Sequence, residues 1–96
     1  MAVEHIVWLK FKPGVTSQRI AEHLANLRSL TDRVPGITGF RIGENFTDRA
    51  GGYTHGFIVT FPSRKELEAY LPHPEHQAVA KPLVADADVL AMDFEC

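Results

Sequence analysis

Four short segments of this chain are rich in β-branched and aromatic residues, and the strands they would form are largely apolar on both faces. In residues 3–11, one face would carry Val3, His5, Val7, Leu9 and Phe11. Ile6 and Trp8 would lie on the opposite face. A strand with two apolar faces is normally covered on both sides. We therefore expect a sheet that needs a cover above and below.

The strand-like segments span residues 3–11, 37–46, 53–61 and 89–95, and helical patterns separate them. A first helix should begin at Thr16 or Ser17 and end before Pro35-Gly36. Apolar residues recur through it at helical spacing, at Ile20, Leu24, Leu27, Leu30 and Val34.

Two shorter helices are expected before the last strand. Residues 64–71 follow Ser63, a plausible N-cap, with Glu66 as its capping-box partner. Pro72 and Pro74 should break the chain there, because proline interrupts a helix. A further helix should run over residues 75–84 despite an internal proline.

The resulting order, β-α-β-β-α-β, is that of a ferredoxin-like α+β subunit over a single domain, residues 1–96. Such a unit has one four-stranded antiparallel sheet with its helices on one face. The 96 residues leave nothing to cover the other face. We therefore expect a homodimer in which two sheets meet as a dimeric α+β barrel.

Composition narrows the class of protein. The net charge of −2 and the lack of a basic stripe argue against nucleic-acid binding. No apolar run reaches the roughly 18 residues of a spanning helix, and the first residues do not look like a signal peptide. The single cysteine, Cys96, cannot form an internal disulfide. We expect a cytoplasmic protein that does not bind membranes.

A cluster of proton-transfer residues lies at the break between the last two helices. Tyr70, His73 and His76 follow one another at intervals of three and would share one side of a regular helix. Histidine suits general acid–base work near neutral pH, and a buried tyrosine hydroxyl can polarise a substrate oxygen. The alternative is structural, since a proline-rich turn also uses His and Tyr to cap a core.

His5 and His55 lie on apolar faces of the first and third strands and could point into one cavity. Either could instead be a hydrogen-bonded core residue. A catalytic metal is not favoured, because His-x-x-His interrupted by proline is not a helical zinc pattern. Arg41 and Asp93 are charged residues within apolar strands, and solvated edge positions explain both.

Several motifs resemble the stress-responsive A/B barrel domain (Dabb) family. They run from end to end of the chain: His5-Ile6-Val7-Trp8-Leu9-Lys10-Phe11-Lys12, Val34-Pro35-Gly36-Ile37, Gly43-Glu44-Asn45, Tyr53-Thr54-His55-Gly56, Val59-Thr60-Phe61, Tyr70-Leu71-Pro72-His73-Pro74-Glu75-His76 and Asp93-Phe94-Glu95. The Tyr-x-x-His-Pro-x-His run is the most specific of them.

The resemblance implies a ferredoxin-like subunit that pairs into a dimeric barrel. It also implies roles by analogy with a plant polyketide cyclase of the family, which closes a linear chain by aldol condensation. His76 would be the general base and Tyr70 its assistant, with His5 and His55 lining the pocket. Leu27 replaces an aromatic wall residue of that enzyme, so the pocket should differ. Some relatives bind magnesium through backbone carbonyls near the positions of Val34 and Ile37.

Two functions from different classes remain open. The first is a cyclase-like lyase without a cofactor, acting on a small carbonyl or polyketide ligand. Its pocket wall would comprise His5, His55, Val7, Leu9, Phe57 and Val59. The second is a non-catalytic stress-response protein or small-ligand-binding dimer. A haem or metal handler is a third reading, and it predicts visible absorbance or bound metal in the purified protein.

Overall fold

The structure, a computed structural model, describes residues 1–96. Its elements are β1 (Val3–Phe11), α1 (Ser17–Arg33), β2 (Gly39–Glu44), β3 (His55–Phe61), α2 (Arg64–Tyr70), α3 (Pro74–Asp86) and β4 (Ala87–Glu95). This order confirms the predicted β-α-β-β-α-β arrangement, with α2 and α3 together filling the second helical position. No helix has both the length and the apolar character needed to span a membrane.

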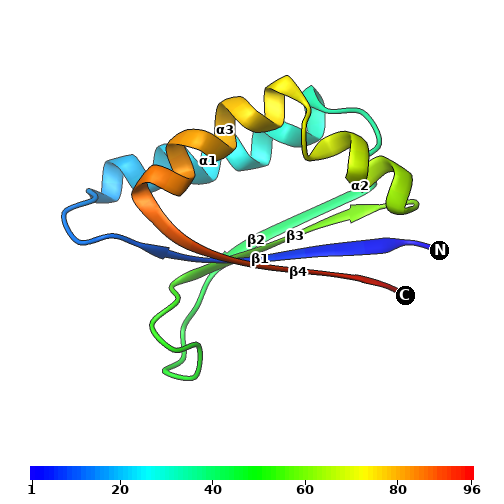
Figure 1. Ribbon diagram of the computed structural model, residues 1–96. Helices are drawn as coiled ribbons and strands as arrows, with labels where there is room; N and C mark the ends of the chain where they lie inside the picture. The colour runs from blue at the N-terminus through cyan, green and yellow to red at the C-terminus, as the bar shows by residue number, and fades with distance from the viewer.

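The four strands form one antiparallel sheet in the order β2-β3-β1-β4. All three helices cover the same face of this sheet (Figure 1). The register places His5 between Val59 of β3 and Asp93 of β4. Residues paired across neighbouring strands share a face, so Asp93 lies on the helix side with His5.

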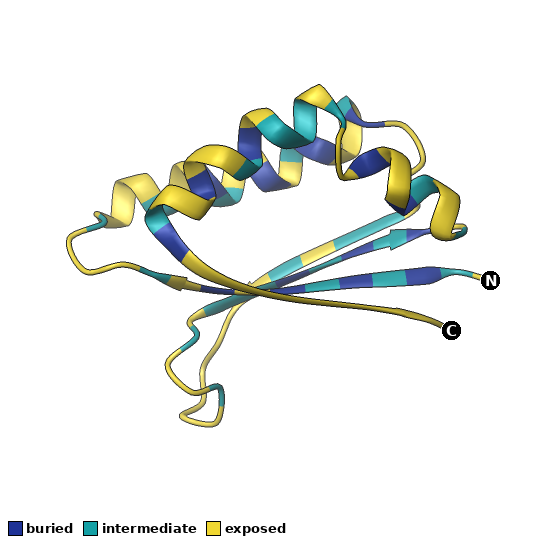
Figure 2. Ribbon diagram, in the orientation of Figure 1, coloured by how far each residue is buried: buried dark blue, intermediate teal, exposed yellow.

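The core fills the layer between the helices and the sheet. Alternate residues of β1 and β3 are buried there, as the banding of these strands in Figure 2 shows. The side chains of Leu9, Leu30, Val59 and Phe61 are fully buried. The alternate apolar residues of the strands and the regularly spaced apolar residues of α1 therefore pack into one core.

Local signals explain where the helices begin and end. The Thr16 hydroxyl accepts a hydrogen bond from the Arg19 N–H at 3.1 Å and caps α1. At α2 the predicted capping box differs: the Ser63 hydroxyl donates to the Glu66 carboxylate and makes no cap hydrogen bond to the backbone.

Four strand boundaries differ from the sequence-based expectation: β2 spans residues 39–44 rather than 37–46, β3 starts at residue 55 rather than 53, and β4 also starts elsewhere. β2 and β3 are shorter at the loop that joins them, where the Asn45 side chain bonds the Thr47 and Tyr53 carbonyls. These local bonds turn the chain out of the sheet. β4 starts at Ala87, two residues earlier than predicted, because α3 runs into it without a loop.

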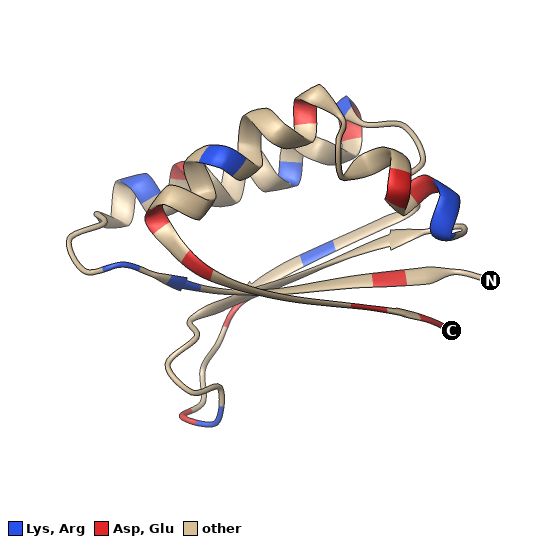
Figure 3. Cartoon of the chain, in the orientation of Figure 1, with Lys and Arg blue, Asp and Glu red and all other residues tan.

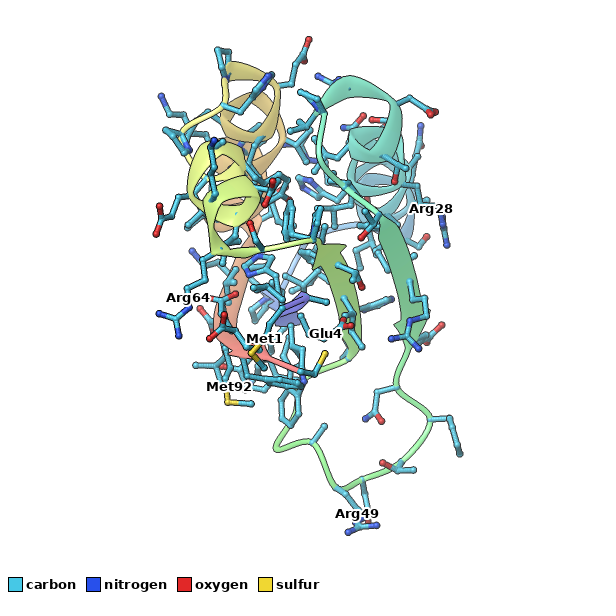
Figure 4. The ribbon with its side chains drawn as sticks, turned by 90° about the vertical axis from the view of Figure 1, so that its right-hand side faces the viewer. Met1, Glu4, Arg28, Arg49, Arg64 and Met92 are labelled. Atoms are coloured by element: carbon cyan, nitrogen blue, oxygen red, sulfur yellow. The ribbon has the colours of Figure 1, made fainter.

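The face of the sheet away from the helices is bare and apolar. We call it the open face; its large side chains are Ile6, Trp8, Leu90, Met92 and Phe94. Trp8, Leu90 and Met92 are 45%, 54% and 61% exposed. Figure 4 shows Met92 on the side of the sheet away from the helices. Residues 89–92 of β4 carry no charge, and Figure 3 shows an uncharged stretch within this strand.

Candidate active site

A cavity of about 190 Å³ lies on the helix side of the sheet, where α3 passes over β1 and β4. Two histidines, His5 and His76, supply its only polar side chains. The other lining residues are apolar: Val7, Leu27, Phe57, Leu71, Val79, Ala80, Leu83, Val84, Val89 and Ala91. A mostly apolar pocket with few converging polar groups is typical of small-molecule sites.

His76 is in the first turn of α3 and is half-buried. Its Nδ1 lies 2.9 Å from the Leu71 carbonyl oxygen. A carbonyl only accepts hydrogen bonds, so Nδ1 carries the proton and the neutral ring has its lone pair on Nε2. Nε2 has no hydrogen-bond partner within the protein. Burial lowers the pKa of His76, and nearby His5 and His73 lower it further, so the ring is neutral near pH 7.

His5 is 7% exposed on β1, and its Nδ1 lies 2.5 Å from the Asp93 Oδ1. The carboxylate fixes the proton on Nδ1 and orients the ring, as in other histidine–carboxylate pairs. Asp93 is exposed on the edge strand β4, as expected, and its contact with His5 is an addition to that expectation. The only sequence signal was a weak one, a single carboxylate within an apolar strand, because the pairing of His5 with Asp93 depends on the strand register.

Tyr70 ends α2 and is only 1% exposed. Its ring centroid lies 4.2 Å from that of His76 and 5.9 Å from that of His5, so it stands beside both imidazoles. Its ring is not among the residues that line the cavity. Burial raises the pKa of the Tyr70 hydroxyl well above its usual value, which keeps it a neutral hydrogen-bond donor.

His73 has a local structural task. It is the N-cap of α3, where its Nδ1 accepts from the Glu75 N–H at 3.1 Å. Pro74 follows at the first helical position, which suits a residue without an N–H. The chain therefore turns at His73 and carries His76 back towards Tyr70.

The remaining predicted pocket residues divide into two groups. Val7 and Phe57 line the cavity, and Leu27 contributes to its wall. His55, Leu9 and Val59 do not line it. His55 lies near the other end of β1, edge-on to Phe11, with its Nδ1 2.8 Å from the Thr54 hydroxyl. Its strand face was predicted, but its distance along the strand separates it from His76.

No group of three or more His, Cys, Asp and Glu residues is arranged to hold a metal ion. A magnesium site built from backbone carbonyls near Val34 and Ile37 stays a prediction, because carbonyl ligands depend on no particular side chain.

The family model of the stress responsive A/B barrel domain matches residues 3–96, nearly the whole chain. The protein belongs to this family. It is 29% identical to the stress-response A/B barrel domain-containing protein HS1 of Arabidopsis thaliana, over 97% of this chain and 88% of HS1. It is 33% identical to olivetolic acid cyclase of Cannabis sativa over 79% of this chain and 77% of the cyclase.

Solved structures share the fold. A dimeric ferredoxin-like protein of unknown function from Jannaschia sp. CCS1 is 34% identical, covers all of both chains and has a TM-score of 0.86. The ferredoxin-like fold expected from the order of elements is therefore confirmed, and the family resemblance with it.

Proposed function

We propose that this A/B barrel protein abstracts a proton next to a carbonyl group, with His76 as the general base. One observation carries the proposal: the His76 ring lines an apolar cavity while its Nδ1–H is held by the Leu71 carbonyl. A neutral imidazole with a free Nε2 is the form that accepts a proton, and the lowered pKa keeps it in that form near neutral pH.

Each neighbouring group has a part in the proposed step. The α-carbon of the ligand gives its proton to Nε2 of His76, and the electron pair of the broken C–H bond forms an enolate. The Tyr70 hydroxyl makes no hydrogen bond within the protein. Every polar side-chain atom that is fully buried has a hydrogen-bond partner, so the Tyr70 oxygen is not fully buried. The hydroxyl hydrogen is therefore free, and in the proposed step it would donate to the enolate oxygen from beside the His76 ring, at the border of the cavity that Tyr70 itself does not line. His5, oriented by Asp93, adds a second polar group to the wall.

The enolate would then attack a second carbonyl of the ligand in an aldol closure, or expel a leaving group in an elimination. The proton on His76 returns to the new alkoxide or departs with the leaving group, so no redox partner or cofactor is required. The likeness to olivetolic acid cyclase supports the same class of chemistry.

The working unit in this proposal is a homodimer. The open face exposes a contiguous set of large apolar side chains, which monomeric proteins rarely leave bare. The Jannaschia relative and two other structures of this fold, from Bacteroides fragilis and Thermobifida fusca, are described as dimeric. A second copy seated on the open face would supply the missing cover.

Deuterium uptake at the α-carbon of simple ketones in D₂O tests the base directly, since it needs no knowledge of the natural ligand. The wild-type protein should speed uptake above the buffer rate. His76→Ala should lower this rate by ~10²–10⁴-fold, the usual contribution of a positioned base. His73→Asn is the matched control, because asparagine keeps an N-cap acceptor while removing an imidazole. Equal rates for wild type and His76→Ala would refute the assignment.

A non-catalytic ligand carrier is the second candidate, and the almost wholly apolar lining favours it. It predicts binding without exchange, and His76→Ala would then change the melting temperature rather than a rate.

A further inference from the structure

We infer that the ligand of the His76 cavity is a small neutral carbonyl compound, about the size of one aromatic ring with a short side arm, and carries no carboxylate. The inference rests on the proposed function for the site, and it adds the size and the charge of what the site accepts.

The size follows from the volume. An engineered apolar cavity of about 150 Å³ accommodates benzene, which is roughly 25 Å³ for each non-hydrogen atom. At that ratio, the cavity of about 190 Å³ holds about eight non-hydrogen atoms. Pockets for drug-sized ligands are larger, at about 300–1,000 Å³. A long polyketide chain would therefore not fit wholly inside the cavity.

The walls that set this size are firmly packed. Val7, Leu27 and Phe57 at the base of the cavity are 3%, 3% and 5% exposed, and they belong to the main core. Enlarging the cavity on that side would disturb the whole core, because protein interiors are close-packed. The rim is different: Leu71, Val84, Val89 and Ala91 are exposed and apolar. A ligand would thus enter past the exposed apolar residues of the rim and contact the tightly packed core residues at the base.

The charge follows from the lining. No lysine or arginine lines the cavity. The His76 ring is kept neutral by burial, and the charge that stands behind the His5 ring is the negative one of Asp93. A carboxylate moved from water into this space would have no cation to pair with, which is costly. A neutral carbonyl oxygen needs only one hydrogen-bond donor. Because the Nδ1–H of each lining histidine is already held by Leu71 or Asp93, that donor is the Tyr70 hydroxyl of the proposed step, whose ring stands beside both imidazoles.

Three probes separate these properties: acetophenone for the expected ligand, benzoate for the charge and hexanophenone for the size. Binding is followed by backbone amide chemical shifts in NMR titrations at pH 7. Acetophenone should bind saturably, with a dissociation constant on the order of 1 mM, as expected for so small a ligand. Benzoate and hexanophenone should each bind at least about tenfold more weakly, or about 1.4 kcal/mol.

Two variants in which leucine replaces an alanine test where the ligand binds. Ala91→Leu places a larger side chain at the cavity rim on β4, where Ala91 is exposed and its replacement leaves the core intact. It should weaken acetophenone binding about tenfold or more. Ala69→Leu, on the exposed surface of α2 and away from the cavity, should leave the affinity unchanged.

The contrary results are distinct. Benzoate binding as tightly as acetophenone would overturn the charge inference, and hexanophenone binding as tightly would overturn the size. Unchanged affinity in Ala91→Leu would place the ligand elsewhere. If these inferences fail while His76→Ala still abolishes deuterium exchange, the base stands and only the ligand class is wrong. If acetophenone binds as expected but no exchange occurs, the ligand class stands and the proposed reaction is wrong.

Discussion

The tautomer of His76 is set by a turn whose residues are all close together in the sequence. Pro72 and Pro74 flank His73, whose ring caps α3, and the helix then starts so that His76 meets the Leu71 carbonyl. One hydrogen bond thereby decides which ring nitrogen carries the proton. The same contact leaves the ring packed on Tyr70.

The burial of His76 should make the stability of the fold depend on pH. The pKa of His76 is lower in the folded protein than the value of about 6.5 in the unfolded chain. The unfolded state therefore binds more protons as pH falls below about 6.5, and the folded state is destabilised in that range. His76→Gln removes this contribution, so the loss of melting temperature between pH 7 and pH 5 should be smaller in the variant. Parallel curves for the two proteins would contradict the lowered pKa.

At the residue scale, the sequence predicted the histidine–tyrosine cluster but not its partners. The local spacing indicated Tyr70, His73 and His76 together, and the family resemblance favoured Tyr70 and His76 among them. Asp93 stood out as a charge within an apolar strand, but its contact with His5 was not predicted, because the contact joins residues 88 positions apart and depends on the register of β4. His55 shares the helix-side face with His5, as predicted, yet a face alone does not give the position along a strand.

The junction between α3 and β4 is held to α1 by a partly buried polar cluster. His23 of α1 is 3% exposed, and its Nε2 lies 2.6 Å from the Asp86 Oδ2. The Arg19 Nε donates to the same oxygen at 2.7 Å. Phe11 of β1 stacks on the His23 ring. Three elements thus meet at Asp86, the last residue of α3.

Removing that carboxylate should loosen the junction. Asp86→Ala leaves the His23 Nε2–H buried without an acceptor, and a buried donor without a partner is destabilising. The melting temperature should fall clearly in Asp86→Ala and hardly at all in Asp88→Ala, whose carboxylate is exposed.

The hydrogen bonds from His23 and Arg19 also lower the pKa of Asp86, so the difference between Asp86→Ala and wild type should shrink as pH falls and Asp86 is protonated. Equal melting temperatures for the two variants would show that the cluster does not hold the junction.

At the element scale, the existence and the order of the strands and helices were predictable from periodicity and proline. Both ends of β2 and the starts of β3 and β4 were not. The boundaries at the loop between β2 and β3 depend on Asn45 side-chain bonds, and the start of β4 depends on the direct passage from α3 into β4. Neither feature changes the pattern of apolar residues in the sequence.

Across the whole molecule, the helices cover one face of the sheet and leave the other bare. The sequence predicted this imbalance, because the strands are apolar on both sides while only one set of helices is available. If a second copy covers the open face, Met92 becomes buried. Met92→Glu should then raise the dimer dissociation constant about a hundredfold, because it buries an unpaired carboxylate.

Sedimentation equilibrium measures that constant. Ala69→Glu is the matched control, since it adds the same charge to the exposed side of α2. A Met92→Glu protein that dimerises as well as the control would exclude the open face as the dimer interface.

The central claim is that the folded protein presents the free Nε2 of a neutral His76 to its cavity. Long-range ¹H–¹⁵N NMR of the imidazole rings measures this directly, with acetophenone added stepwise at pH 7. We predict a proton on Nδ1 of His76 and a saturable shift of its Nε2 resonance on titration, while the His23 ring, which faces Asp86, does not respond. A His76 ring protonated on Nε2, or one that is indifferent to the ligand, would contradict the account.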